Sequence, residues 1–171
     1  MIPSSEFAAL FEIYYPKLYG YIRSQMADQA TAEDITATAF ERAYLHRHTY
    51  DAAKGSFATW LFRIARNLVI NQHTAAERRP VQQELDEALP VSSSTPSPEQ
   101  HLLQQEQQLH LQAGLNRLSN RDQEIIHLRF FGQLQNREIA RLLDLNEKTV
   151  SVIILRALQK LKTRLEAENR P

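Results

Sequence analysis

Residues 136–155 constrain the fold of this chain more than any other segment. Small and apolar side chains recur there at a spacing that lets two short helices cross closely, with Ala140 at the crossing point. Asn146 can cap a second helix that begins at Glu147 and runs to about Glu166. The pattern predicts a helix-turn-helix, and an ordinary pair of packed helices is the alternative. The apolar set is Ile139, Ala140, Leu143, Leu145, Val150 and Ile153.

The composition favours helices and argues against an enzyme. The 171 residues are 43% hydrophobic, include only four glycines and contain no cysteine, which excludes disulfides and thiol chemistry. His46 and His48 are a possible metal pair without a nearby third ligand, so we expect no metal, no cofactor and no enzymatic activity. The start of the chain lacks the features of a secretory leader, and its apolar runs are too short to span a bilayer. These features predict a cytoplasmic protein without membrane insertion.

Charge is distributed unevenly along a chain that is neutral overall. Twenty basic residues balance twenty acidic ones, yet residues 121–164 hold nine basic residues against five acidic ones. Residues 81–120 reverse this balance, with one arginine against five acidic residues. Local charge determines which partners a surface attracts, so the basic C-terminal unit is a candidate for binding nucleic acid.

A proline- and serine-rich segment divides the chain. Prolines at positions 80, 90, 96 and 98 and the run of residues 92–95 interrupt any helical period. We therefore predict an all-α protein with two small helical domains joined by a flexible linker. The expected boundaries are an N-terminal helical domain over 1–80, an acidic linker over 81–98 and a C-terminal helix-turn-helix domain over 99–171.

Capping residues and apolar spacing predict the individual helices. We expect helices over residues 5–26, with a break or kink near Pro16, and over 56–74. A helix over 32–46 is expected to start at Thr31 with Asp34 as its capping partner. Beyond the linker, a helix from Pro98 to about Arg117 is expected. The next is capped by Ser119, runs to about Phe131 and is ended by Gly132.

Three blocks in this order, residues 32–44, 57–67 and 118–161, resemble the bacterial RNA polymerase sigma factors of the small, two-domain extracytoplasmic-function class. The resemblance extends over residues 7–165. It implies a factor that binds core RNA polymerase and directs promoter-specific transcription initiation. It also implies that an anti-sigma factor clamps the two domains. The competing reading is a stand-alone helix-turn-helix regulator that does not associate with polymerase.

The resemblance assigns the minus-thirty-five promoter element to the C-terminal domain. Side chains near the start of the second helix would enter the major groove, and basic residues around it would meet phosphate. Two departures from the family pattern are the sequence at 151–153, which makes the preferred promoter hard to infer from relatives, and Asp144 in place of the usual turn glycine. Asp tolerates the left-handed conformation at a cost of roughly 1 kcal/mol. The groove candidates are Lys148, Thr149, Ser151 and Val152, and the phosphate candidates are Arg137, Arg156 and Lys160.

The N-terminal domain is implied to open the minus-ten element, a task that needs aromatic faces and a basic groove. Phe57, Trp60 and Ile64 share one apolar stripe and are better read as core. Asn67 resembles the family residue at a flipped-base pocket, and an ordinary polar surface position is an equal alternative. The loop over residues 48–55 is the expected specificity determinant. The minus-ten candidates are Tyr50, Lys54, Arg63, Arg66, Asn67 and Asn71.

Polymerase docking is expected on the helix over residues 32–46. A solvated helix face would explain its charges equally well without the resemblance. The family's Gln-acid pair is replaced here by Ala37 and Thr38, which predicts altered docking chemistry. The docking candidates are Glu33, Asp34, Glu41 and Arg42.

Overall fold

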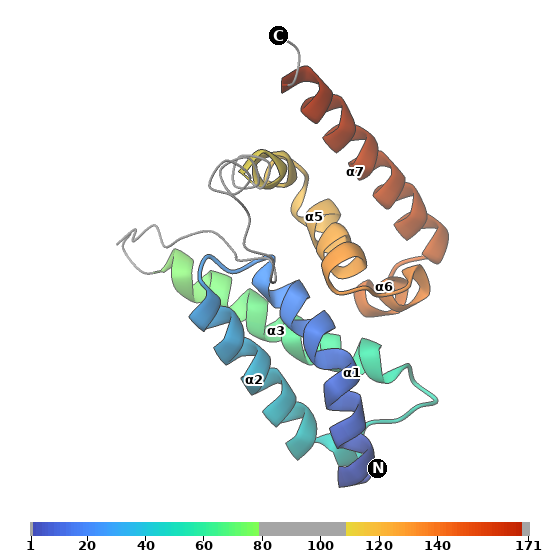
Figure 1. Cartoon of the computed structure of the whole chain (residues 1–171). Coiled ribbons are helices and arrows are strands. Elements are labelled where there is room, and N and C mark those ends of the chain that lie inside the picture. Colours follow the sequence, from blue (N-terminus) through green and yellow to red (C-terminus); the bar gives the residue numbers. More distant parts are fainter. Residues whose placement is uncertain (1, 79–108, 169–171) are drawn as a thin grey trace.

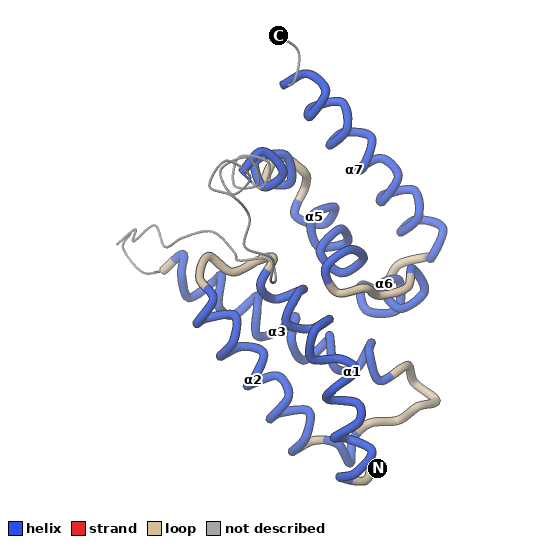
Figure 2. Tube along the Cα trace, in the orientation of Figure 1, coloured by secondary structure: helices blue, strands red, loops and turns tan. Residues whose placement is uncertain are grey.

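The computed structural model describes residues 2–78 and 109–168, and it confirms the all-α prediction for this part of the chain. Figure 2 shows helices joined by turns and loops, with no strand among the described residues. The expected linker over 81–98 and the helix start at Pro98 lie outside them. Residues 109–115 are helical and continue toward Arg117 in a turn, as expected for the end of that helix.

The N-terminal half is a bundle of three long helices, α1 (Ser4–Arg23), α2 (Gln29–Leu45) and α3 (Phe57–Glu77). A short 3-10 turn, η1 (Arg47–Thr49), follows α2. The three helices pack against one another in pairs (Figure 1). Burying their apolar faces supplies the main stabilisation of such a bundle. The fully buried side chains include Leu18, Tyr21, Ile22, Leu61 and Phe62.

Two expectations for this half differ from the structure in detail. Helix α1 continues through Pro16, so the break that was expected there as one of two possibilities does not occur. Pro16 is exposed, so the carbonyl that loses its helical donor lies on the solvent side. Helix α2 starts earlier than expected because Asp28, rather than Thr31, caps it. Asp28 accepts hydrogen bonds from the Thr31 amide at 2.7 Å and the Thr31 hydroxyl at 2.8 Å, and these bonds lower the pKa of its carboxyl.

The C-terminal half contains α5 (Asn120–Ile126), the π-helical turn η2 (His127–Phe131), α6 (Asn136–Leu143) and α7 (Glu147–Glu168). Ser119 caps α5 by accepting a hydrogen bond from the Asp122 amide at 3.2 Å, as predicted. Gly132 ends the helical run at the expected place. Asp144 has φ 55° and ψ 50°, which confirms the left-handed turn.

The two halves share one apolar core. The buried cluster that contains Phe62 of α3 continues through Leu128, Leu134 and Ile139 of the C-terminal half. Two glycines allow this close approach. A Cβ atom on Gly20 would lie 2.9 Å from the carbonyl oxygen of Phe131, and one on Gly132 would lie 2.8 Å from the ring of Phe62. The described parts of the chain are therefore folded against each other in a closed arrangement.

Candidate nucleic-acid interface

The start of α7 presents an exposed reading surface. Asn146 accepts a hydrogen bond from the Lys148 amide at 2.8 Å, which confirms its role as a cap. The candidates Lys148, Thr149, Ser151 and Val152 are all exposed. Helix α7 packs on α5 and α6, and in Figure 1 its outer side faces away from the N-terminal helices. The surface is thus open in the closed arrangement.

Buried residues on the opposite face of α7 hold this surface in position. Val150, Ile153, Ala157 and Leu161 recur at helical spacing and are almost completely buried. Ile139 and Ala140 of α6 are buried as well, as the helix-turn-helix pattern predicted, whereas Leu143 and Leu145 are only half-buried. The sequence pattern therefore identified both the packing and the exposed side of this unit.

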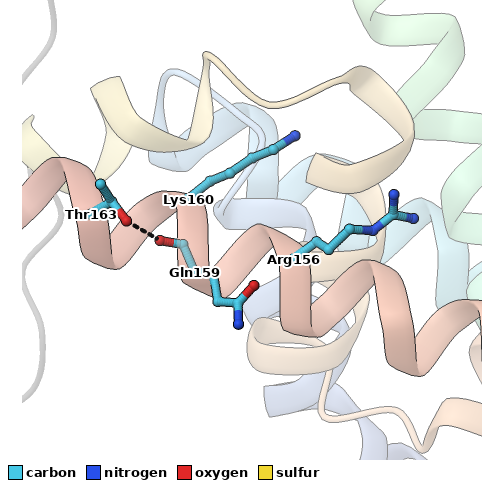
Figure 3. Close-up of a pocket in the computed structure, with 4 residues that line it drawn as sticks. All are labelled: Arg156, Gln159, Lys160 and Thr163. Carbon is cyan, nitrogen blue, oxygen red and sulfur yellow. Dashed lines mark hydrogen bonds between the residues drawn. The ribbon is translucent and has the colours of Figure 1, made fainter.

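Basic side chains continue along α7 beyond the reading surface. Arg156 and Lys160 lie one turn apart and line a shallow hollow of about 360 Å³ together with Gln159 and Thr163 (Figure 3). Both are exposed, as is Arg137 on α6. A positively charged hollow beside a helix that fits the major groove is suited to phosphate oxygens.

The minus-ten candidates are divided by the structure into exposed and engaged residues. Lys54, Arg63, Asn67 and Asn71 are exposed around α3 and the loop before it. Tyr50 is half-buried, and its hydroxyl donates a hydrogen bond to the Gly55 carbonyl at 3.3 Å. Its ring lies 5.5 Å from that of Trp60, which is itself half-buried at the edge of the core. Of the expected core trio, Phe57 is buried, and Trp60 and Ile64 are partly buried and pack against the core.

Arg66 is bound to the other half of the protein. Its guanidinium forms a two-pronged ion pair with Glu124 of α5, through Nε to Oε1 and through Nη2 to Oε2 at 3.2 Å. The hydrogen bond to Glu124 raises the pKa of Arg66, so the cation is stabilised there. Sequence reasoning missed Glu124, because nothing local to either residue pairs positions 58 apart in the chain.

Two more polar contacts join the halves. The Ser56 hydroxyl donates to Glu138 Oε1 at 2.8 Å, while Oε2 of the same carboxylate caps α6 by accepting from the Gln135 amide at 3.0 Å. Ser24 is hydrogen-bonded to Nδ1 of His127 at 2.8 Å. Burial, with a smaller contribution from the nearby His73, lowers the pKa of His127 to about 4. The imidazole is therefore neutral at physiological pH.

The docking candidates Glu33, Asp34, Glu41 and Arg42 are all exposed on α2. Glu33 accepts a hydrogen bond from Gln29 at 2.6 Å on the same helix. These charges share the N-terminal bundle with an aromatic patch that sequence reasoning missed. The patch consists of the exposed rings of Phe11 and Tyr15 beside Phe40, with Phe11 and Phe40 centroids 4.6 Å apart. The four-residue spacing of the two aromatics on α1 was the available signal.

The structure supplies no metal cluster or membrane helix in the part that it describes. The rings of His46 and His48 are 6.2 Å apart, and the described residues contain no group of three or more potential ligands. Within residues 2–78 and 109–168, no helix is both long and apolar enough to cross a bilayer.

The described part of the chain is all-α and carries an exposed helix-turn-helix with basic residues along its second helix. These features place the protein in the class of helical DNA-binding proteins. Comparison with known families is more specific. The Sigma-70 region 2 family matches residues 10–79, and the Sigma-70, region 4 family matches residues 114–163.

Relatives match along most of the chain. The ECF RNA polymerase sigma factor RpoE of Cereibacter sphaeroides is 31% identical over 160 residues, covering 91% of this chain and 84% of the relative. BldN of Streptomyces coelicolor, another ECF RNA polymerase sigma factor, is 32% identical over 91% of this chain, which spans 58% of BldN. The chain therefore belongs to the ECF RNA polymerase sigma factors, and a stand-alone regulator is not favoured.

A solved structure supports the fold independently. The sigma factor RpoE of Bartonella quintana, crystallised with the anti-sigma factor NepR, aligns over 97% of this chain and 99% of its own with a TM-score of 0.71. The two sequences are 19% identical, so this likeness bears on the fold alone.

Proposed function

We propose that this chain binds core RNA polymerase in the cytoplasm and directs promoter-specific transcription initiation, without chemistry of its own. The observation that carries the proposal is the pair of sigma-70 matches, region 2 near one end and region 4 near the other end of a single chain. Two separate DNA-contacting units on one protein are what recognition of two promoter elements requires. We retain a 1–80 docking and minus-ten domain and a 99–171 minus-thirty-five domain as the proposed division.

The proposed upstream contacts rest on exposure and charge. Lys148, Thr149, Ser151 and Val152 are exposed at the start of α7, within reach of base edges when the helix lies in a major groove. Val152 offers an apolar surface for a thymine methyl group. The hollow with Arg156 and Lys160 would receive backbone phosphates, joined by Arg137 from α6.

One of the proposed minus-ten contacts, that of Arg66, favours a change in the closed arrangement. Tyr50, Lys54, Arg63, Asn67 and Asn71 are accessible in whole or in part. Glu124 engages Nε and Nη2 of Arg66, so these two nitrogens become available to DNA only after the ion pair breaks. We therefore propose that the two halves separate when the protein joins core polymerase through the α2 residues Glu33, Asp34, Glu41 and Arg42.

An anti-sigma factor is the third proposed partner. The neighbour from Bartonella quintana is bound to such a protein, and the closed arrangement of this chain resembles it over nearly its whole length. A partner that holds the halves together would keep Arg66 engaged and the factor inactive.

Reconstitution tests the proposal. The purified full chain and core polymerase are incubated with a promoter library, and the transcripts are sequenced. We expect enrichment of two spaced elements with the wild-type chain, and a lower transcript yield from the same elements with Arg156→Glu, which reverses a proposed phosphate contact. Core polymerase that neither copurifies with the chain nor initiates specifically in its presence would refute the proposal and favour a stand-alone regulator.

A further inference from the structure

Ser151 is held by two hydrogen bonds within the protein. Its hydroxyl donates to the Glu147 carbonyl at 3.1 Å, one turn earlier on α7. The Asn136 amide nitrogen, at the start of α6, donates to the same hydroxyl oxygen at 2.9 Å. Asn136 thus reaches from one helix of the helix-turn-helix to the other, across 15 positions of sequence, and fixes an exposed side chain of the reading surface.

These two bonds determine what Ser151 can offer to DNA. A serine hydroxyl has one proton to donate and two lone pairs that accept. The proton is used by Glu147, one lone pair is used by Asn136, and one lone pair remains. Exchanging the nitrogen and oxygen of the Asn136 amide would free the second lone pair but not the proton, because the carbonyl oxygens of Glu147 and Asn136 would then both compete for it. Toward solvent, Ser151 is a hydrogen-bond acceptor only.

The major groove contains few donors for such a group. Adenine presents its N6 amino group and cytosine its N4 amino group, whereas guanine and thymine present only acceptors there. We propose that Ser151 reads an amino base, adenine or cytosine, in the upstream promoter element, and that Asn136 is the positioning residue that imposes this preference. The inference rests on the proposed function, since it requires α7 to enter the groove of that element.

The shielding of Asn136 supports its positioning role. Its amide oxygen is buried and accepts no hydrogen bond from the described residues, so the bond from its amide nitrogen to Ser151 is what orients this side chain. Asn136 is half-buried, whereas Ser151 is exposed. DNA would therefore meet the serine, with the asparagine behind it.

The test uses the full chain with core polymerase and a promoter library randomised in the upstream element. Ser151→Ala is expected to relax the preference at one base pair by about five-fold, the effect of one lost hydrogen bond. Asn136→Ala is expected to relax the same base pair, because the Ser151 side chain, no longer held by Asn136, can rotate away from the Glu147 carbonyl and donate its proton to guanine or thymine. Asn116→Ala, an exposed amide outside the helix-turn-helix, is the matched control and should leave every position unchanged.

Base analogues then identify the atom that is read. At the base pair found with the library, adenine is replaced by purine, or cytosine by 2-pyrimidinone, each of which lacks the amino group. Wild type should lose about five-fold in initiation with the analogue, and Ser151→Ala should lose nothing further.

Three results would overturn the inference while leaving the proposed function intact. The first is an enriched element in which Ser151→Ala changes no position. The second is a loss traced to a keto oxygen rather than the amino group. The third is an Asn136→Ala variant that lowers initiation equally on all sequences, which would make its role merely structural. Absence of any enriched upstream element with wild type would instead refute the proposed function itself.

Discussion

Gly20 lies where the two halves meet, and a single methyl group there should separate them. In Gly20→Ala, the added Cβ would sit 2.9 Å from the carbonyl oxygen of Phe131, about half an ångström closer than ordinary packing allows. The obstructing atom is backbone and cannot rotate away. Overpacking of this kind costs about 1–3 kcal/mol. Alanine also favours helix α1 by up to about 1 kcal/mol, but this gain is the same in the closed and open forms and leaves the balance between them unchanged.

The expected shift toward the open form is therefore about 5- to 150-fold. It can be measured by energy transfer between two dyes, because the chain has no cysteine of its own. Cysteines introduced at the exposed positions Ala37 on α2 and Gln159 on α7 would report the separation of the halves. The matched control is Gly55→Ala, whose Cβ would lie 3.8 Å from Thr59, an ordinary contact within the N-terminal half.

We expect Gly20→Ala to lower the transfer efficiency and Gly55→Ala to leave it at the wild-type value. A strained but still closed variant would instead show a lower melting temperature. If Gly20→Ala keeps both the wild-type distance distribution and at least the wild-type melting temperature, the close approach of α1 to the Phe131 carbonyl does not limit packing, and the reasoning fails.

Three further predictions concern the pH dependence, the phosphate contacts and the turn. Burial lowers the pKa of His127 from about 6.5 to about 4. Between these pH values the unfolded chain binds more protons than the folded one, so the free energy of unfolding should fall by up to about 3 kcal/mol as the pH drops from 6.5 to 4. The melting temperature of His127→Gln should change less than that of the wild type between pH 6.5 and 4.5. An equal change in the two proteins would contradict this prediction. Arg156→Glu should weaken DNA binding on all sequences alike and reduce its salt dependence, whereas a change of sequence preference would count against a phosphate contact. Asp144→Gly should raise the free energy of unfolding by up to about 1 kcal/mol in denaturant titrations, and destabilisation would show that the left-handed Asp is not strained.

Local signals allowed much of the fold to be predicted from the sequence. Ser119 and Asn146 cap the helices that they were expected to cap, since a cap depends on residues within one turn. Asp144 adopts the left-handed conformation for the same reason. The start of α2 was misplaced because Asp28 and Thr31 are both acceptable caps, and only the bonds between them decide which one acts.

The sequence predicted those parts of the candidate site that lie on a single helix. It did not predict the parts that depend on contacts between the two halves of the protein. The exposure of Ser151 and Arg156 follows from the periodicity of α7. The capture of Arg66 by Glu124 does not, because an ion pair between distant segments leaves no periodic trace in the sequence. From the sequence, Gly20 is only a residue of low helix propensity. Its role becomes clear when the structure places the carbonyl of Phe131 beside it.

The closed arrangement affects the two proposed DNA contacts unequally, and this gives an order to their use. The reading surface of α7 is exposed while the halves are together, so an upstream duplex can be held without opening. Arg66 is released only when the ion pair to Glu124 breaks. Loosening the interface should therefore favour strand opening and leave duplex binding unchanged. Gly20→Ala separates these steps experimentally, because it adds bulk between the halves and alters none of the side chains proposed to touch DNA.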